Sequence, residues 1–109
     1  MAKKIVFQYG DKEYTLEYNR NSIKKMEDNG FVAADISDKP MTRLPQLFGG
    51  AFLAHHPFVK QETVNDILDH MKDKHGLYDS LGEMYGECMK ALIDDPEDSE
   101  GNVTWEMQG

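Results

Sequence analysis

The sequence lacks the features on which secreted and membrane-spanning proteins of this size depend. It has one cysteine, Cys88, in 109 residues, so no intramolecular disulfide can form, whereas small secreted domains usually need such cross-links. Its apolar runs fall far short of the roughly 18 residues that cross a membrane, and its first residues do not resemble a signal peptide. We therefore expect a cytoplasmic protein.

Basic residues are also scarce. The chain has 12 Lys and Arg against 20 Asp and Glu, which gives a formal net charge of -8. Because nucleic acids and anionic membranes are bound through clustered positive charge, neither is expected as a partner. Six acidic residues and no basic ones lie in residues 94–109. We expect the run 94–101 to be a solvated linker, followed by an alternating segment, Asn102–Met107, that either docks as an edge strand or waits for a partner.

The remaining composition is that of one small folded domain. Its hydrophobic fraction of 39% and its 5 Tyr, 5 Phe and 1 Trp are enough for a modest core, and the length allows only one. We expect a single α+β domain over residues 1–94 and an acidic tail over residues 95–109.

A β-hairpin is predicted at the N-terminus. Residues 3–9 and 13–18 alternate between apolar and polar side chains, as half-buried strands do. Gly10–Asp11 suits a two-residue type II′ turn, in which glycine takes the first central position. Since a lone hairpin is marginal in water, helices must cover its apolar face. The expected cross-strand pairs are Phe7 with Tyr14 and Ile5 with Leu16.

Two helices are predicted in the middle of the chain. The first begins at Asn19 or Asn21 and ends at Asn29–Gly30, whose residues suit a left-handed helix terminus. The second begins at Asp38, with a proline in its first turn, and ends before Pro57. A glycine pair within it, Gly49 and Gly50, predicts a kink or a close contact with another helix.

Two further helices are predicted at about residues 61–75 and 77–93. The short link between them favours an antiparallel pair, which completes a hairpin packed on about four mostly antiparallel helices. The last helix carries one apolar stripe, formed by Leu77, Leu81, Met84, Tyr85, Cys88 and Leu92.

No arrangement of residues indicates catalysis or a metal site. His70 and His75 are five positions apart and so do not share a helical face, and no paired cysteines or clustered carboxylates accompany them. We expect His55–His56 to lie at a helix C-terminus, where an imidazolium favours the helix dipole. A calcium-loop pattern that starts at Asp95 has Glu100 where a glycine is needed. We therefore predict a protein without enzymatic activity, cofactor or metal.

Five large aromatic residues are candidates for contact with a protein partner. They lie near helix ends, beside the glycine pair or in the tail, although most aromatic residues of a small domain fill its core. Seven methionines, whose flexible thioethers suit adaptable surfaces, favour an exposed patch. The candidates are Phe31, Phe48, Phe52, Phe58 and Trp105.

Several motifs resemble a family of small phage and prophage proteins encoded among tail genes. The matching runs are Tyr14 to Phe31, Asp38–Met41, Leu47–Phe52, His55–Pro57 and Asn102–Glu106. Members of that family are regarded as tail assembly chaperones or related tail-morphogenesis proteins. The resemblance implies a non-enzymatic protein of the bacterial host cytoplasm that keeps the tape measure protein soluble and presents it for tail tube polymerisation.

Two other classes stay open from the sequence. One is a structural component of the virion, such as a head–tail connector or tail-completion subunit. The other is an acidic inhibitor that mimics DNA, although the densest acid lies in the tail instead of across one surface. A homo-oligomer is compatible with each of these classes.

Overall fold

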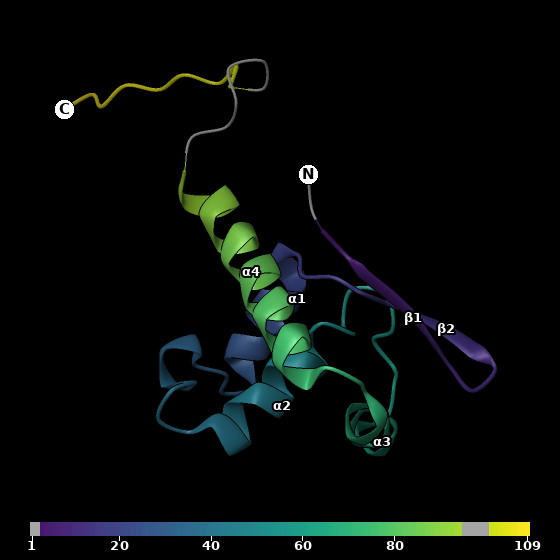
Figure 1. The fold of residues 1–109 in the computed structure, drawn as a ribbon. Helices are drawn as coiled ribbons and strands as arrows, with labels where there is room; N and C mark the ends of the chain where they lie inside the picture. Colours follow the sequence, from purple (N-terminus) through teal and green to yellow (C-terminus); the bar gives the residue numbers. More distant parts are fainter. Residues whose placement is uncertain (1–2, 95–100) are drawn as a thin grey trace.

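The structure is a computed structural model that describes residues 3–94 and 101–109. Within these residues, an antiparallel two-stranded hairpin precedes four α-helices (Figure 1), which confirms the predicted α+β class. The elements are β1 (Ile5–Tyr9), β2 (Lys12–Leu16), α1 (Arg20–Asp28), a short 3-10 helix η1 (Ala33–Asp35), α2 (Pro40–Gly50), α3 (Gln61–His70) and α4 (Lys74–Ile93).

The hairpin has the predicted register, in which Ile5 faces Leu16 and Phe7 faces Tyr14. Gly10 has a φ of +62° and no other residue of the turn has a positive φ, as a type II′ turn requires. Both strands are shorter than predicted, since β1 begins at Ile5 and β2 ends at Leu16.

Helix α1 begins and ends as its sequence predicts. Asn19 is the N-cap: its side chain accepts a hydrogen bond from the Ser22 backbone N–H, and Ser22 Oγ accepts one from the Asn19 N–H in return. At the other end Gly30 has a φ of +95°. Its N–H donates to the Glu27 carbonyl and the Phe31 N–H donates to the Met26 carbonyl, which is the bonding pattern of a Schellman motif.

Helix α2 differs from its prediction at both ends. Its N-cap is Lys39 instead of Asp38, and it ends at Gly50 instead of continuing toward Pro57. Two consecutive glycines weaken the helix there, and the chain continues in tighter turns with bonds between residues three apart. The predicted close helix contact is confirmed at Gly50, because a Cβ atom there would lie 2.3 Å from Met26 Sδ of α1.

The early end of α2 also corrects the prediction for His55 and His56. Neither terminates a helix, because both lie in the turns that follow α2 and reach back to β2. His55 Nε2 is 2.7 Å from the carboxylate Oε1 of Glu17. His56 Nε2 accepts a hydrogen bond of 3.0 Å from the Thr15 backbone N–H. Together with a bond from the Glu17 N–H to the Ala51 carbonyl, these turns cover the outer edge of β2.

The boundary between α3 and α4 was also predicted wrongly. Helix α3 ends at His70 and α4 already begins at Lys74. Asp73, in the left-handed conformation with a φ of +51°, caps α4 by accepting a hydrogen bond from the Gly76 N–H. Gly76 therefore lies in the first turn of α4 and does not end α3.

The link between these helices does not make them an antiparallel pair. Both pack mainly on α2. Figure 1 views α3 along its axis while α4 runs across the picture. The extended conformation of Met71 and the left-handed conformation of Asp73 turn the chain, so the short link does not simply reverse its direction.

The core lies where the apolar face of the hairpin meets α1, α2, α3 and the first half of α4. Its fully buried large side chains are Leu16, Leu47, Phe48, Phe52, Ile67 and Leu81. Among the described residues no helix combines the length and the apolar character needed to cross a membrane.

The C-terminal segment is extended and exposed. Residues 101–109 have no regular secondary structure (Figure 1), so Asn102–Met107 is not docked as a strand. The predicted acidic linker lies almost wholly in residues 95–100, outside the described part of the chain, as does the start of the calcium-loop pattern.

Candidate functional site

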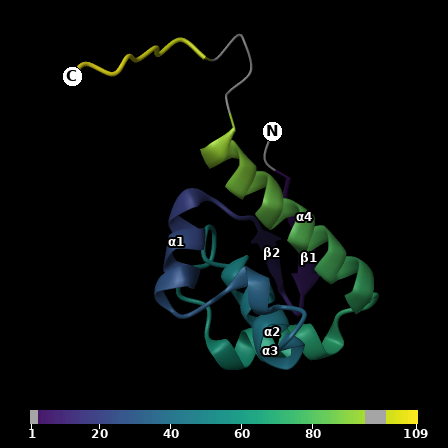
Figure 2. The same ribbon diagram turned by 90° about the vertical axis from the view of Figure 1, so that its left-hand side faces the viewer.

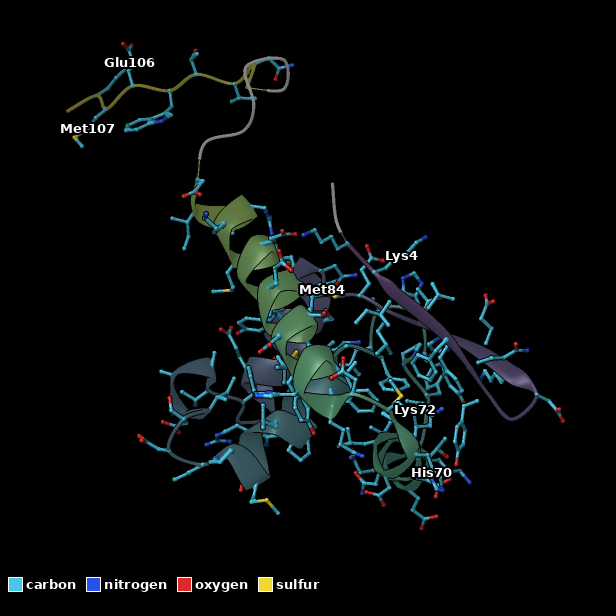
Figure 3. All side chains as sticks on the ribbon, in the orientation of Figure 1. Lys4, His70, Lys72, Met84, Glu106 and Met107 are labelled. Carbon is cyan, nitrogen blue, oxygen red and sulfur yellow. The ribbon has the colours of Figure 1, made fainter. Side chains whose placement is uncertain are left out.

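The apolar stripe of α4 is fully covered only along its first half. Leu77, Leu81 and Met84 are 8%, 0% and 6% exposed and face the core, and Figure 3 shows Met84 near the middle of the helix. Beyond them the stripe continues, but Leu92 is 56% exposed and the neighbouring Ile93 is 74% exposed. The last turns of α4 extend past the other helices in two perpendicular views (Figure 1 and Figure 2).

Tyr85 anchors α4 at the point where the helix leaves the core. Its ring makes edge-to-face contacts with the rings of Tyr18 and Phe31, with both pairs of centroids 5.6 Å apart. Each such aromatic pair contributes about 0.5–1.5 kcal/mol beyond the burial of its surface. The helix is thus held firmly up to Tyr85; Cys88 and Met89 in the next turn are still partly buried, and only the end of the helix, with Leu92 and Ile93, is exposed.

Two grooves flank these last turns. The first, which we call the α1–α4 groove, has a volume of about 400 Å³ and runs between α1 and the end of α4. The second has a volume of about 540 Å³ and lies on the other side of α4, where Lys3 and the link from β2 to α1 (Glu17–Asn19) line it. Cys88 and Ala91 line both. The other α4 residues that line them are Met84, Glu87, Met89 and Leu92.

The charges around the grooves are mixed. Arg20, Lys24 and Glu27 of α1 line the α1–α4 groove. On the other side Lys3 Nζ pairs with the carboxylates of Glu83 and Glu87 of α4, at 2.9 and 3.2 Å. These exposed pairs contribute at most about 1 kcal/mol each. An apolar floor with charged rims is typical of a protein-binding surface.

The chemistry of Cys88 does not indicate a nucleophile. Burial raises the pKa of its thiol, and the smaller effects of Arg20 and Glu17 oppose each other. A reactive cysteine needs a lowered pKa, because the thiolate is the attacking species. Cys88 therefore contributes apolar surface to both grooves.

The five aromatic candidates divide into two groups. Phe31, Phe48 and Phe52 are 4%, 0% and 0% exposed, so as folded they belong to the core and do not form the predicted surface patch. Phe58 and Trp105 are 95% and 84% exposed. Phe31 and Phe52 each follow a helix, and Phe48 lies in the last turn of α2. Sequence spacing alone therefore does not predict that all three side chains point into the core.

Phe31 still borders a third groove, between α1 and α2, of about 460 Å³. Its walls include Met26 of α1, Pro45 of α2 and the glycine pair. Gly49 and Gly50 leave the groove open on this side, because neither carries a side chain. This α1–α2 groove is therefore separate from the two grooves beside the end of α4.

Three of the four histidines, His55, His56 and His70, make structural contacts. No group of three or more His, Cys, Asp or Glu side chains is placed to hold a metal ion in residues 3–94 and 101–109. His70 Nδ1 bonds the Asp66 carbonyl at 2.7 Å, and His55 contacts Glu17. His56 must carry its proton on Nδ1, since its Nε2 accepts from the Thr15 N–H.

His56 makes the stability of the fold depend on pH. Burial, followed by the positive charges of Lys12 and His55, lowers the pKa of His56 below its ordinary value of 6.5. The folded state binds a proton at His56 more weakly than the unfolded state does. The contribution of neutral His56 to the free energy of unfolding is therefore complete above about pH 6.5 and is lost as the pH falls below it. We expect urea unfolding at pH 5 to show a loss of about 1 kcal/mol relative to pH 7, the value of one hydrogen bond.

The variant His56→Gln provides the comparison, because its amide oxygen can accept the Thr15 N–H and does not titrate. Other groups titrate in the same range, so the difference between wild type and variant is the measured quantity. Parallel stability curves between pH 7 and pH 5 would show that His56 does not carry this dependence.

The sequence predicted the α4 stripe correctly but not where it is uncovered. Periodicity shows that Cys88 and Leu92 share a face with Leu81, and it says nothing about the length of the helices packed against that face. Helix α1, only 9 residues long, does not extend far enough to cover all 20 residues of α4. The grooves follow from this difference in length.

Comparison with known proteins assigns the chain to a family. A family described as a domain of unknown function (DUF5055) matches residues 1–108, almost the entire chain. No curated protein and no solved structure matches it. The chain therefore belongs to the DUF5055 family.

Proposed function

We propose that this protein is a non-catalytic tail assembly chaperone of a phage or prophage. In this proposal the incompletely covered half of α4 binds an amphipathic helix of the tape measure protein during tail assembly. The observation that carries it is the apolar end of α4, where Cys88 and Met89 are only partly buried, Leu92 and Ile93 are exposed, and a groove lies on each side.

Several features support a helical client. An apolar groove takes the apolar face of a helix through side chains spaced three, four and seven residues apart. Cys88, Met89 and Leu92 supply adaptable or aliphatic contacts, and methionine in particular repacks around different partners. The net charge of -8 favours solubility of a complex with an aggregation-prone protein. The choice of the tape measure protein as the client rests on the resemblance to tail proteins.

The test is co-expression with the tape measure protein encoded in the same gene cluster. We expect the client to co-purify and its soluble fraction to rise. Leu92→Asp should reduce the amount of co-purified client about tenfold or more, because it places a charge in the centre of the apolar contact. A client that is equally soluble alone and does not co-purify would contradict the proposal.

Met41→Asp is the matched control. Met41 is 89% exposed on α2, far along the chain from α4, so the substitution adds the same charge without touching the grooves. It should leave binding unchanged. Mass spectrometry of purified particles then tests the alternative of a virion component, since a chaperone is absent from mature tails and a structural subunit is present.

A further inference from the structure

The outer edge of β1 carries backbone N–H and C=O groups that β2 does not engage. The two-residue turn makes Tyr9 and Lys12 a hydrogen-bonded pair, and such pairs alternate along an antiparallel ladder. Val6 and Gln8 therefore direct their N–H and C=O groups away from β2. On the other strand the Thr15 and Glu17 N–H groups point outward in the same way, and both find acceptors in the turns after α2.

The edge of β1 has no such cover. Val6 and Gln8 have no outward hydrogen-bond partner in the part of the chain that the structure describes, and Val6 is 51% exposed. The apolar face of the strand is also incompletely covered, because Ile5, Phe7 and Tyr9 are only half-buried. An added strand would therefore complete both the hydrogen bonding and the apolar face.

The segment Asn102–Met107 has the pattern of such a strand. Val103, Trp105 and Met107 alternate with polar residues and are 84–88% exposed. Figure 3 shows Glu106 and Met107 on opposite sides of the extended chain. A strand of this kind is not stable alone in water, and its three large apolar side chains gain most from a partner that covers one face.

We propose that the Asn102–Met107 segment of a second copy of this chain adds to the edge of β1, and that two copies exchange these segments reciprocally. The occupant is a second copy because of direction. Helix α4 ends at the same end of the molecule as the start of β1 (Figure 1), so a chain's own segment would enter the sheet parallel to β1. Another copy can approach antiparallel, which is the slightly more stable arrangement, and twofold exchange forms the contact twice.

Charge complementarity selects a register. Lys4 is exposed and points away from α4 (Figure 3), and Glu106 is the acidic residue of the segment. An antiparallel register with Glu106 opposite Lys4 places Trp105 opposite Ile5 and Val103 opposite Phe7. The apolar side chains of the two strands then share the half-buried face.

Trp105 is the sole tryptophan and reports on the exchange directly. We expect full-length protein to form dimers by sedimentation as its concentration rises, with a matching shift of the tryptophan emission to shorter wavelength. Val6→Pro removes an N–H that makes no bond to β2 and should abolish both, whereas Val6→Thr keeps the N–H and should retain them.

A mixing experiment identifies donor and acceptor. The double variant Val103→Ser, Trp105→Ser cannot donate an apolar segment but keeps its β1 edge, whereas Val6→Pro can donate but not accept. Each should be monomeric alone, and an equimolar mixture should form a heterodimer. In that mixture only the Val6→Pro chain contains a tryptophan, so the emission shift reports on the segment that this chain donates.

The register has its own test that does not affect the fold, since both residues are exposed. Lys4→Glu should weaken the dimer roughly tenfold, because it places like charges opposite each other twice per dimer. Adding Glu106→Lys to the same chain should restore it.

Three results would overturn the proposal. A short-wavelength emission that does not change with concentration in a monomer would mean that the segment docks on its own chain. A dimer that persists in the Val103→Ser, Trp105→Ser variant would mean a different interface. A monomer with solvent-exposed tryptophan at every concentration would mean no association. None depends on the tape measure protein, so this proposal and the proposed function fail separately.

Discussion

Phe52→Ala is expected to reduce the free energy of unfolding by about 3–5 kcal/mol, as measured by urea denaturation. Phe52 is 0% exposed and its ring meets four others edge to face. The centroids of Phe48, Tyr14, His56 and Phe7 lie 5.1, 5.7, 6.3 and 6.4 Å away. Phe7 and Tyr14 come from the hairpin, whereas Phe48 and His56 belong to the segment around Phe52, so no single shift can fill the cavity. Since small domains are stable by about 5–15 kcal/mol, much of the fold's stability would be lost.

Phe58→Ala is the matched control. Phe58 lies only six residues further along and is 95% exposed, so we expect a change within about 0.5 kcal/mol. A similar loss in both variants would mean that Phe58 packs on the domain in solution. A small loss of stability in Phe52→Ala would mean that neighbouring core side chains move in and fill the cavity.

These two phenylalanines show what the sequence could not decide. Both follow the glycine pair, and both were candidates for a partner-binding surface. Whether each side chain is buried or exposed depends on where α2 ends. Because the chain leaves the helix at Gly50 and continues in tight turns, Phe52 stays directed into the core, and Phe58 comes after Pro57 in a loop that faces solvent. Composition and helical periodicity contain no information on that turn.

Features set by local chemistry were predicted well. The hairpin register follows from a two-residue turn and strict alternation, which together leave one arrangement. The N-cap at Asn19 and the left-handed Gly30 depend on side chains within four residues of each terminus. Such features need no knowledge of the tertiary fold.

Features that depend on competition between neighbouring sequence signals were not predicted well. His75–Gly76 resembles a helix end, but Asp73 provides a cap for the next helix three residues before Gly76, and that cap prevails. The candidate site shows the same limit on a larger scale. The α4 stripe is local and was predicted, whereas its incompletely covered half depends on the length of α1 and on the anchoring of Tyr85.

Gly50→Val is expected to destabilise the fold by about 2–3 kcal/mol. A Cβ atom at Gly50 would lie 2.3 Å from Met26 Sδ and 2.6 Å from Met26 Cγ, so the obstacle includes the middle of that side chain as well as its tip. Met26 is only 3% exposed, and it must either swing into the α1–α2 groove or push α1 away from α2. The small gain in helix propensity over glycine, a few tenths of a kcal/mol, does not offset this strain.

The control for this substitution is Gly82→Val. Gly82 also lies within a helix but has no atom within 4 Å of an added Cβ, so only the propensity gain remains and stability should stay equal or rise slightly. A double-mutant cycle then isolates the contact. Met26→Ala should cost less in the Gly50→Val background than in wild type, because the smaller side chain relieves the overlap. Additive costs would show that the closeness of α1 and α2 at Gly50 is not the source of the loss.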